Sequence, residues 1–488
     1  MSRLRVYRPI AKTARAVAAA ATFGAMAFAI LGAGWPMFGY DAARSGYDRS
    51  DHSLSPANVG KLRRRWQIAL GDVADSTPVY LLSVSVGGKA MPMLFQTAKD
   101  GTTYGIEAGS GKIVWRFATH GPNITTSTPA ADPTGHTLYV PGVDGFVHEL
   151  DPSSGTERRG HGFPVRITAI PTTEKDASPL SVAGGYLYAV TSGYFGDAPP
   201  YDGHLVAVRL GDGTTRVFNS LCSNVRTLPT STSCSANLSG IWARAGAVVD
   251  PDPSLHGRVY VATGNGNFNA SSGGHDYGDS VIALSRDGSR IEGYYTPSNY
   301  AELESGDTDL GSTAPALLPR EAHSRTPLLA VQGGKDALLR LLDRAHLGGL
   351  GGELQHVDLG DRLFSAPAVW NDGNGTSIIV GLPSGLKSYR LRTDAQGVSH
   401  LVAGWTSHLA DSSPEGTSPV IVNGVVFVAS SGAVLAFDAR TGASLWSSAS
   451  DAAGGSIGDV HWESPIAVNG AVYCSDEGGH LTAYTLPH

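Results

Sequence analysis

A short motif recurs along the chain: a Ser or Thr, a proline directly or one residue later, and then a strand of apolar residues. Seven copies are legible, for example "DSTPVYLL" from residue 75; their prolines are Pro78, Pro129, Pro179, Pro315, Pro367, Pro419 and Pro465. The wide interval between Pro179 and Pro315 leaves room for one degenerate copy, which begins at Trp242. The chain therefore consists of eight units of about 50 residues, and its fold must be built from copies of one structural unit.

Each unit has a second signature: a glycine, an alternating strand, a polar turn with Gly, and a strand that ends in Trp. It is clearest in "SGAVLAFDARTGASLW" (431–446). Alternation with period two, with turn residues every 8–12 positions, indicates about four antiparallel strands per unit. A content of 62 Gly and 28 Pro, with only 16% charged residues, agrees with a turn-rich β protein. We therefore predict an all-β fold, an eight-bladed β-propeller of four-stranded antiparallel blades.

The last unit, from Glu463 to the end, has only three strands. An early segment, "VGKLRRRWQIAL" (59–70), has the Trp-bearing form of a fourth strand with no first three before it. We expect this N-terminal strand to pair with the last blade and close the ring, because closure removes exposed sheet edges.

The first residues carry five bases, no acid, and then an Ala-rich apolar run that ends in small residues, the pattern of a secretory signal peptide. We expect a leader or N-terminal anchor over 1–34 and one propeller domain over 35–488. The protein would then be exported, periplasmic or extracellular, or tethered to the membrane by an uncleaved segment. The net charge of −7 becomes −12 without those five bases, so nucleic acid is excluded as a partner.

Three cysteines are present. Cys222 and Cys234 flank a Ser/Thr-rich loop, and a disulfide between them suits an exported protein; two free thiols are the alternative. Cys474 lies in an apolar strand and is expected to be a small buried side chain. There is no CxxCH sequence, so no haem is expected.

The stretch "SGIWARAGAVVDPDPSLHGRVYVATGN" (239–265) resembles the quinoprotein alcohol dehydrogenase family, eight-bladed propellers that bind pyrroloquinoline quinone (PQQ) with a calcium or lanthanide ion. The resemblance implies that Trp242 stacks on the quinone and that Asn265 ligates the metal. The neighbouring Asn267 and Asn269 are expected only to shape the turn, since Asn tolerates left-handed backbone.

The resemblance continues through "ELESGDTDLGSTAPALL" (302–318) and "GGKDALLRLLDR" (333–344). It implies that Asp307 is the catalytic base and also meets the metal, that Asp309 is a further metal ligand, and that Lys335 contacts the quinone and assists catalysis. Oxygen ligands suit a hard cation, and an aspartate can take the alcohol proton. The implied activity is oxidation of a small alcohol or related hydroxyl substrate, with electrons passed to a separate acceptor protein.

The chain also departs from that family. The family's metal-binding Glu falls in "SGYFGDAPPYDG" (192–203), which has no Glu; Asp197 or Asp202 could substitute. The spacing from Pro297 to Asp307 is longer than in the family by about five residues, which could leave Asp307 out of reach. No two cysteines are adjacent, so the family's usual disulfide between neighbours is missing.

Each candidate residue has a simpler interpretation: Trp242 as packing, Asn265 as a turn residue, Asp307 and Asp309 as a surface turn, and Lys335 as a solvated lysine. One alternative function is a non-catalytic scaffold for envelope proteins, because the repeat equally resembles that of outer-membrane assembly propellers. Another is a propeller that binds sugars or polymers through exposed aromatic residues, namely Tyr194, Tyr201, Tyr294 and Tyr295.

Overall fold

The structure is a computed structural model that describes residues 1, 34–234, 237–409, 415–451 and 454–487. The part of the chain from Gly32 to His488 forms one compact unit. The expected leader over 1–34 lies almost wholly outside the described residues. Within the described ranges, no helix has the length and apolarity needed to span a membrane.

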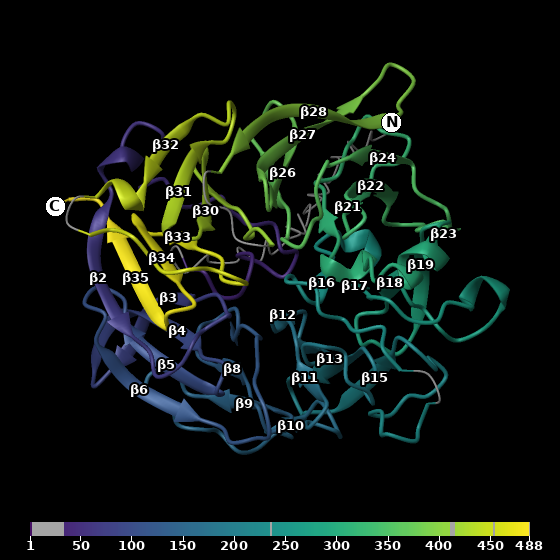
Figure 1. The fold of residues 1–488 in the computed structure, drawn as a ribbon, viewed down its shortest axis with the longest axis horizontal. Helices are drawn as coiled ribbons and strands as arrows, with labels where there is room; N and C mark the ends of the chain where they lie inside the picture. Colours follow the sequence, from purple (N-terminus) through teal and green to yellow (C-terminus); the bar gives the residue numbers. More distant parts are fainter. Residues whose placement is uncertain (2–33, 235–236, 410–414, 452–453, 488) are drawn as a thin grey trace. The chain divides into compact units, whose positions relative to one another are not determined.

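Eight antiparallel sheets surround one axis, and they follow one another around the ring in sequence order (Figure 1). The all-β, eight-bladed propeller expected from the repeat is confirmed. The degenerate copy that begins at Trp242 leads into blade 4, as its place in the repeat predicts.

The first four blades contain these strands, from the axis outward. Blade 1 has β3 (Val79–Val86), β4 (Lys89–Thr97), β5 (Thr102–Glu107) and β6 (Ile113–Ala118). Blade 2 has β7 (Ala130–Ala131), β8 (Leu138–Pro141), β9 (Phe146–Leu150) and β10 (Val165–Arg166). Blade 3 has β12 (Ser181–Ala183), β13 (Tyr186–Gly193), β14 (His204–Arg209) and β15 (Thr215–Asn219), with β11 (Glu174–Asp176) also on β13. Blade 4 has β16 (Val248–Val249), β17 (Val259–Ala262), β18 (Val281–Leu284) and β19 (Ile291–Thr296), extended by β23 (Gly349–Leu350).

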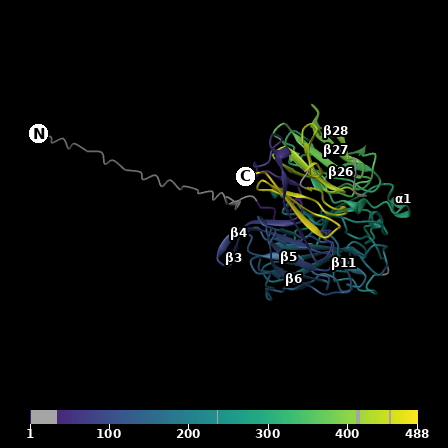
Figure 2. The same ribbon diagram turned by 60° about the vertical axis from the view of Figure 1, so that its left-hand side comes forward.

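The other four blades complete the ring. Blade 5 has β20 (Ala316–Leu317), β21 (Leu329–Gln332), β22 (Leu338–Asp343) and β24 (Gln355–Asp358). Blade 6 has β25 (Ala368–Asn371), β26 (Thr376–Leu382), β27 (Gly385–Thr393) and β28 (Ser399–His408). Blade 7 has β29 (Val420–Val422), β30 (Val425–Ser430), β31 (Ala433–Asp438) and β32 (Ser444–Ser447), joined by β1 (Tyr47–Asp48). Blade 8 has β33 (Ile466–Val468), β34 (Ala471–Ser475), β35 (His480–Thr485) and β2 (Arg63–Ala69). A single short α-helix of the described chain, α1 (Tyr300–Ser305), lies outside the sheets, at the edge of the ribbon in Figure 2.

The ring closes as expected, because β2 pairs antiparallel with β35 and supplies the fourth strand of blade 8. Inner strands such as β30 are buried throughout, since both of their faces pack against neighbouring blades. Outer strands such as β2 alternate between exposed and half-buried residues. The period-two pattern is therefore clearest at the rim, and continuous apolar runs mark the interior.

The Trp residues in the outer strands of blades 1, 7 and 8 each join their blade to the next one in the ring. Trp115 donates its indole N–H to the carbonyl of Pro152 at 2.9 Å, and Trp66 and Trp446 make the same kind of bond to Ala108 and Leu62. A Cβ on Gly155 would lie 2.4 Å from the Trp115 ring, so the turn glycine of the repeat is required for the ring to pack there.

The segment from Trp35 to Asp48 crosses the inner strands of the propeller; we call it the plug. Trp35 exchanges two backbone hydrogen bonds with Tyr80 in blade 1, each 2.8 Å long. The carbonyls of Pro36, Ala42, Ser45 and Gly46 accept backbone hydrogen bonds from blades 2, 4, 6 and 7. The fully buried Arg44 donates to the carbonyl of Leu180 in blade 3 and to that of Ala245, just before blade 4. The sequence analysis did not foresee this plug.

The plug contacts residues that follow the repeat prolines on the inner strands. Inner strands run along the axis, so residues that precede the prolines lie at the other end of the channel. The loops before the inner strands are therefore free to build a site at that end.

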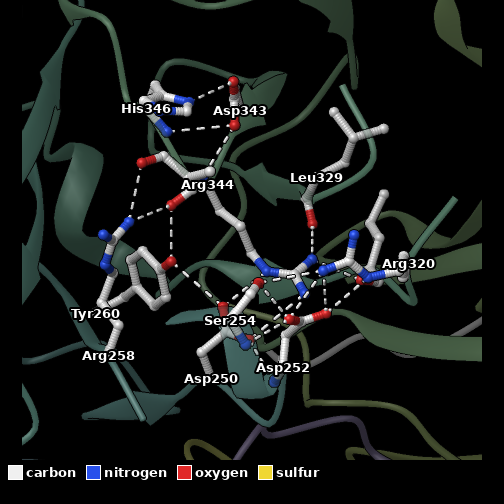
Figure 3. Close-up of polar contacts among 12 residues, drawn as sticks. Asp250, Asp252, Ser254, Arg258, Tyr260, Arg320, Leu329, Asp343, Arg344 and His346 are labelled. Carbon is white, nitrogen blue, oxygen red and sulfur yellow. Dashed lines mark hydrogen bonds and ion pairs between the residues drawn. The ribbon is translucent and has the colours of Figure 1, made fainter. Parts of the chain in front are cut away.

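Blades 4 and 5 are clamped by a buried ion pair (Figure 3). Arg344 Nε lies 2.7 Å from Asp250 Oδ2, with both side chains almost fully buried. Arg344 also donates to the carbonyls of Leu318 and Leu329, both at 2.7 Å. A second pair in the same view, between Arg320 and Asp252, is 3.0 Å long, but the arginine side chain is 48% exposed.

We predict that Arg344→Ala lowers the free energy of unfolding by about 3–5 kcal/mol, because it leaves the Asp250 carboxylate buried without its partner. Denaturant unfolding followed by tryptophan fluorescence measures the change. Arg320→Ala is the matched control and should shift the unfolding midpoint little, since water replaces its exposed contact. Equal losses of unfolding free energy in the two variants would show that the burial of the Arg344–Asp250 pair adds no stability beyond that of an exposed pair.

Candidate functional site

Five residues singled out from the sequence lie together at the end of the channel where the inner strands begin. Lys335 Nζ is 2.5 Å from Asp309 Oδ2 and 3.6 Å from Asp307 Oδ1. Asn265 donates its side-chain amide to Asp307 Oδ1 at 3.4 Å and its backbone N–H to Asp309 Oδ1 at 2.6 Å. The Lys335 ammonium lies 5.3 Å from the centre of the Trp242 ring. We call the set of Trp242, Asn265, Asp307, Asp309 and Lys335 the acidic cluster.

Asn265 lies in the loop that directly follows β17 (Val259–Ala262). Gly264 precedes it, and a Cβ there would lie 2.6 Å from Asp309 Oδ1 and 2.9 Å from Trp242 Nε1. The loop must therefore pass close beneath the cluster with no side chain at this position. Asn267 and Asn269 both donate to Asp276 Oδ2, so they hold the following turn in shape, as expected.

The extra residues between Pro297 and Asp307 form α1, and they do not remove Asp307 from the cluster. The helix ends at Ser305, and Asp307 follows in left-handed backbone with φ of 48°. Its side chain is 69% exposed, whereas that of Asp309 is 4% exposed. Glu304, near the end of α1, accepts a hydrogen bond from the backbone N–H of Gly266.

Two groups beside the cluster have shifted pKa values. Burial works to lower the pKa of Lys335, but the carboxylates of Asp309 and Asp307 outweigh burial and raise it, so the ammonium is retained. Burial raises the pKa of Asp279 to about 8. Asp279 Oδ1 accepts from the N–H of Leu310, while its Oδ2 is buried and has no hydrogen-bond partner among the described residues.

Aromatic residues continue the site across the channel end. The ring of Trp242 lies 5.8 Å from that of Trp462 and 6.3 Å from that of Phe364. The guanidinium of Arg244 lies over the Trp462 ring at 4.5 Å and pairs with Glu415 at 2.8 Å. Its Nε and Nη1 atoms are buried and have no partner among the described residues.

Beyond Trp462 the site becomes a network of charged groups from blades 7, 8 and 1. His461 lies 3.7 Å from Glu415 and 3.8 Å from Asp75. Lys99 lies 2.9 Å from Asp75 and 3.5 Å from Glu477. The ligating atoms of Asp75, His461 and Glu477 are within 4.8 Å of one another, a spacing that could hold a metal ion.

A family model described as outer membrane protein assembly factor BamB matches residues 63–276 and 402–486, more than half of the chain. The chain belongs to this PQQ-like repeat family. No curated protein sequence matches it.

Solved structures share the propeller fold of the PQQ-like repeat at low identity. A quinohemoprotein alcohol dehydrogenase from Comamonas testosteroni has a TM-score of 0.64 and 15% identity, over 93% of this chain and 80% of that one. A europium-containing methanol dehydrogenase has a TM-score of 0.61 and 14% identity, over 93% of this chain and 98% of that one. BamB from Moraxella catarrhalis has a TM-score of 0.53 and 12% identity, over 88% of this chain and 98% of that one.

The two expected substitutes in the loop over 192–203 of this PQQ-like propeller each accept a hydrogen bond from a neighbouring side chain. Asp197 accepts a hydrogen bond from Tyr201 at 2.7 Å, and Asp202 accepts from Ser220 at 3.1 Å. Burial raises the pKa of Asp202 to about 8. The Tyr201 hydroxyl that donates to Asp197 also lies within electrostatic range of Asp307 and Asp309. The replacement of the family's Glu by Asp197 or Asp202 stays a prediction.

The structure also answers three other expectations. Cys222 and Cys234 form a disulfide, and Cys474 is a buried free thiol. The exposed tyrosine surface expected for a polymer-binding propeller is wrong in part, because Tyr201 and Tyr295 are buried. These two rings pack inside the repeat and cannot present a flat face to a ligand.

The sequence analysis missed Arg244, Asp279, Glu304 and Trp462. A signal for one of them was present in the repeat: Trp462 lies just before the Ser464–Pro465 motif, as Asp75 lies just before "STP" and Phe364 just before "SAP". Residues at this position of the PQQ-like repeat meet at one end of the channel.

We predict that stability falls as the pH rises through the titration of His461. Burial works to lower the pKa of His461, but the nearby carboxylates of Asp75 and Glu415 outweigh burial and raise it from 6.5 to about 9. The resulting stabilisation is complete below pH 6.5 and is lost as the pH rises to about 9. The imidazole is 39% exposed, so screening by solvent limits the loss to roughly 1 kcal/mol.

Unfolding free energies between pH 6 and 10 test this, with His461→Gln as the comparison. Glu463, whose pKa burial raises to about 8, also titrates in this range and remains in both proteins. The difference between the two curves therefore isolates the histidine. Parallel curves would contradict the assignment.

Proposed function

We propose that the protein is an exported quinoprotein dehydrogenase that oxidises an alcohol or related hydroxyl compound with PQQ and a calcium or lanthanide ion. The observation that supports this most is the convergence of Asn265, Asp307, Asp309 and Lys335 beside Trp242 at one end of the channel. These residues come from different loops, and a surface turn or a packing role for each would not require them to meet.

The acidic cluster suits a hard cation. Its donors are the side-chain oxygens of Asn265, Asp307 and Asp309, and calcium and related ions prefer oxygen ligands from carboxylates and amides. The buried Oδ2 of Asp279 beside the cluster has no hydrogen-bond partner among the described residues.

The neighbouring aromatic and basic residues suit a flat anionic cofactor. Trp242 and Trp462 present indole rings on which a planar ring system can stack. The two orphaned donors of Arg244 are costly when buried alone, and a carboxylate of the cofactor would satisfy them.

The residues of the chain have separate roles in this proposal. When bound, the quinone would accept the two electrons of the oxidation, with the metal ion increasing its electrophilicity. Asp307, with its exposed carboxylate, would take the proton from the substrate hydroxyl. Lys335 would hold Asp309 in place and offer its ammonium to the cofactor oxygens. A separate acceptor protein would receive the electrons.

Export is supported by the basic and apolar start of the sequence and by the disulfide between Cys222 and Cys234, which is typical of oxidising compartments. We therefore propose a periplasmic or extracellular location, with the alternative of a membrane tether.

A second candidate is a scaffold that binds envelope proteins, favoured by the BamB description of the matching family model and by the lack of a Glu in 192–203. The matched residues leave out 277–401, and this segment contains Asp307, Asp309 and Lys335. The segment outside the match thus supplies Asp307, Asp309 and Lys335, whereas Trp242 and Asn265 lie within the matched residues. We take the three charged residues outside the match as a point in favour of the enzyme.

We predict that the mature protein binds PQQ in the presence of calcium or a lanthanide, with quenching of tryptophan fluorescence, and reduces a dye when simple alcohols are added. Asn265→Ala should weaken metal-dependent binding. Asp307→Ala should lower turnover by about 10²–10⁴-fold, because it removes the proton acceptor.

The scaffold is distinguished by the same titration. Absence of PQQ binding at tens of micromolar, with either metal, would contradict the dehydrogenase. Binding without turnover of any hydroxyl substrate would limit the proposal to cofactor binding.

A further inference from the structure

A second group of titratable residues lies where the ring closes, outside the acidic cluster. Asp75 is in the linker from β2 of blade 8 to β3 of blade 1, His461 precedes β33, and Glu477 is in the turn between β34 and β35. Blades 1 and 8 are neighbours at this point (Figure 1). The three residues thus come from the two blades that begin and end the ring.

The three side chains have the spacing of a metal site. One potential ligand atom from each, a carboxylate oxygen or an imidazole nitrogen, lies within 4.8 Å of the others. His461 Nδ1 is 3.8 Å from Asp75 Oδ2. The side chains of His461 and Glu477 are 39% and 31% exposed, so an ion can reach them from solvent.

The carboxylate of Asp75 gives an independent sign of a ligand. Its side chain is 2% exposed, and the Lys99 ammonium lies 2.9 Å from Oδ2, which keeps the carboxylate ionised. The other oxygen, Oδ1, is buried and has no hydrogen-bond partner among the described residues. Glu477 Oε1 is also buried without a hydrogen bond there, 3.5 Å from Lys99. One ammonium therefore faces two carboxylates, and a cation would satisfy the oxygens that it leaves without a partner.

We propose that Asp75, His461 and Glu477 bind a zinc ion that ties blade 8 to blade 1 and stabilises the closed ring. One imidazole nitrogen and two carboxylate oxygens suit zinc or a similar divalent transition ion, whereas calcium prefers oxygen ligands alone. The site does not depend on the proposed quinone or its metal, because none of its three residues belongs to the acidic cluster. Zinc that binds only the native ring raises the stability of the ring.

Lys99 and the zinc ion compete for the same carboxylates. The lysine side chain is 21% exposed, so its ammonium can turn to solvent when the ion binds. Zinc on Nδ1 of His461 leaves the imidazole proton on Nε2, which lies 3.7 Å from Glu415, and metal-bound histidines commonly donate to a carboxylate in this way. The indole N–H of Trp462, which donates to Nε2 at 2.8 Å in the structure, then turns away. The titration of His461 predicted above therefore belongs to the zinc-free protein.

Zinc would be titrated into the full mature protein after EDTA treatment and buffer exchange, with excess calcium present to fill any site made of oxygens alone. Calorimetry gives the dissociation constant, and thermal unfolding gives the gain in stability. Glu477→Gln and His461→Gln each remove a ligand, and Lys99→Gln removes the competing ammonium. His480→Gln is the matched control, because His480 is a 42% exposed histidine close to Glu477, at the start of β35.

We expect zinc to raise the midpoint of thermal unfolding in the wild-type protein and not in His461→Gln. Glu477→Gln and His461→Gln should weaken zinc binding by at least about tenfold, a loss seen even for residues that only support a ligand. Lys99→Gln should strengthen binding, and His480→Gln should leave it unchanged within twofold.

Equal weakening in His461→Gln and His480→Gln would reduce the effect to surface histidines and overturn the proposal. Unchanged or weaker binding in Lys99→Gln would overturn it as well, since the ammonium would then not compete with the ion. Absence of zinc binding by the wild-type protein would overturn the zinc site alone, because binding of PQQ with calcium or a lanthanide is measured separately.

Discussion

The pairing of β2 with β35 is the constraint on which the rest of the molecule depends. Blade 8 is assembled from the two ends of the propeller chain, so the ring cannot close until the N-terminal strand has joined the last three strands. The repeated blades alone would leave two exposed sheet edges, which are sites of association. Because β2 lies at the outer edge of blade 8, the residues before it have to cross one face of the ring to reach the inner strands.

The plug follows from that constraint. Residues 35–48 return to the axis and bond to inner strands of blades 1, 2, 3, 4, 6 and 7, with Arg44 buried among backbone carbonyls. Burial lowers the pKa of Arg44 to about 9, which leaves the guanidinium charged at neutral pH, and the surrounding carbonyls accept its hydrogen bonds. One end of the channel is thereby filled by the chain itself. Polar loops can then collect at the opposite end without opening a continuous water path through the core.

Much of this architecture could be predicted from the sequence, because propeller blades are repetitive and the Ser/Thr–Pro motif marks each inner strand. The Trp and Gly of each unit are visible in the sequence for the same reason: an indole that crosses to the next blade needs a turn with no side chain beneath it. The plug could not be predicted, since its contacts are backbone hydrogen bonds and one arginine, which leave no periodic pattern. Asn265, Asp307, Asp309 and Lys335 were found through family resemblance, and their meeting in space required the three-dimensional structure. Glu304 had no sequence signal, because it lies in an insertion that breaks the repeat.

Three buried atoms without partners among the described residues, Arg244 Nε and Nη1 and Asp279 Oδ2, lie where the proposed chemistry would take place. Other such atoms lie elsewhere in the propeller, for example Trp35 Nε1 and Asp48 Oδ2 in the plug, whereas the buried pair of Arg344 and Asp250 is fully bonded. Unpaired buried donors and acceptors lower stability. A ligand that supplies both a cation for the carboxylates and anionic oxygens for Arg244 would remove both penalties at once. Binding of such a ligand to the native state alone must also stabilise the propeller, in proportion to the logarithm of its concentration. The same groups that are costly when buried without partners thus favour the binding of such a ligand, which links the stability of the ring to the function proposed for this end of the channel.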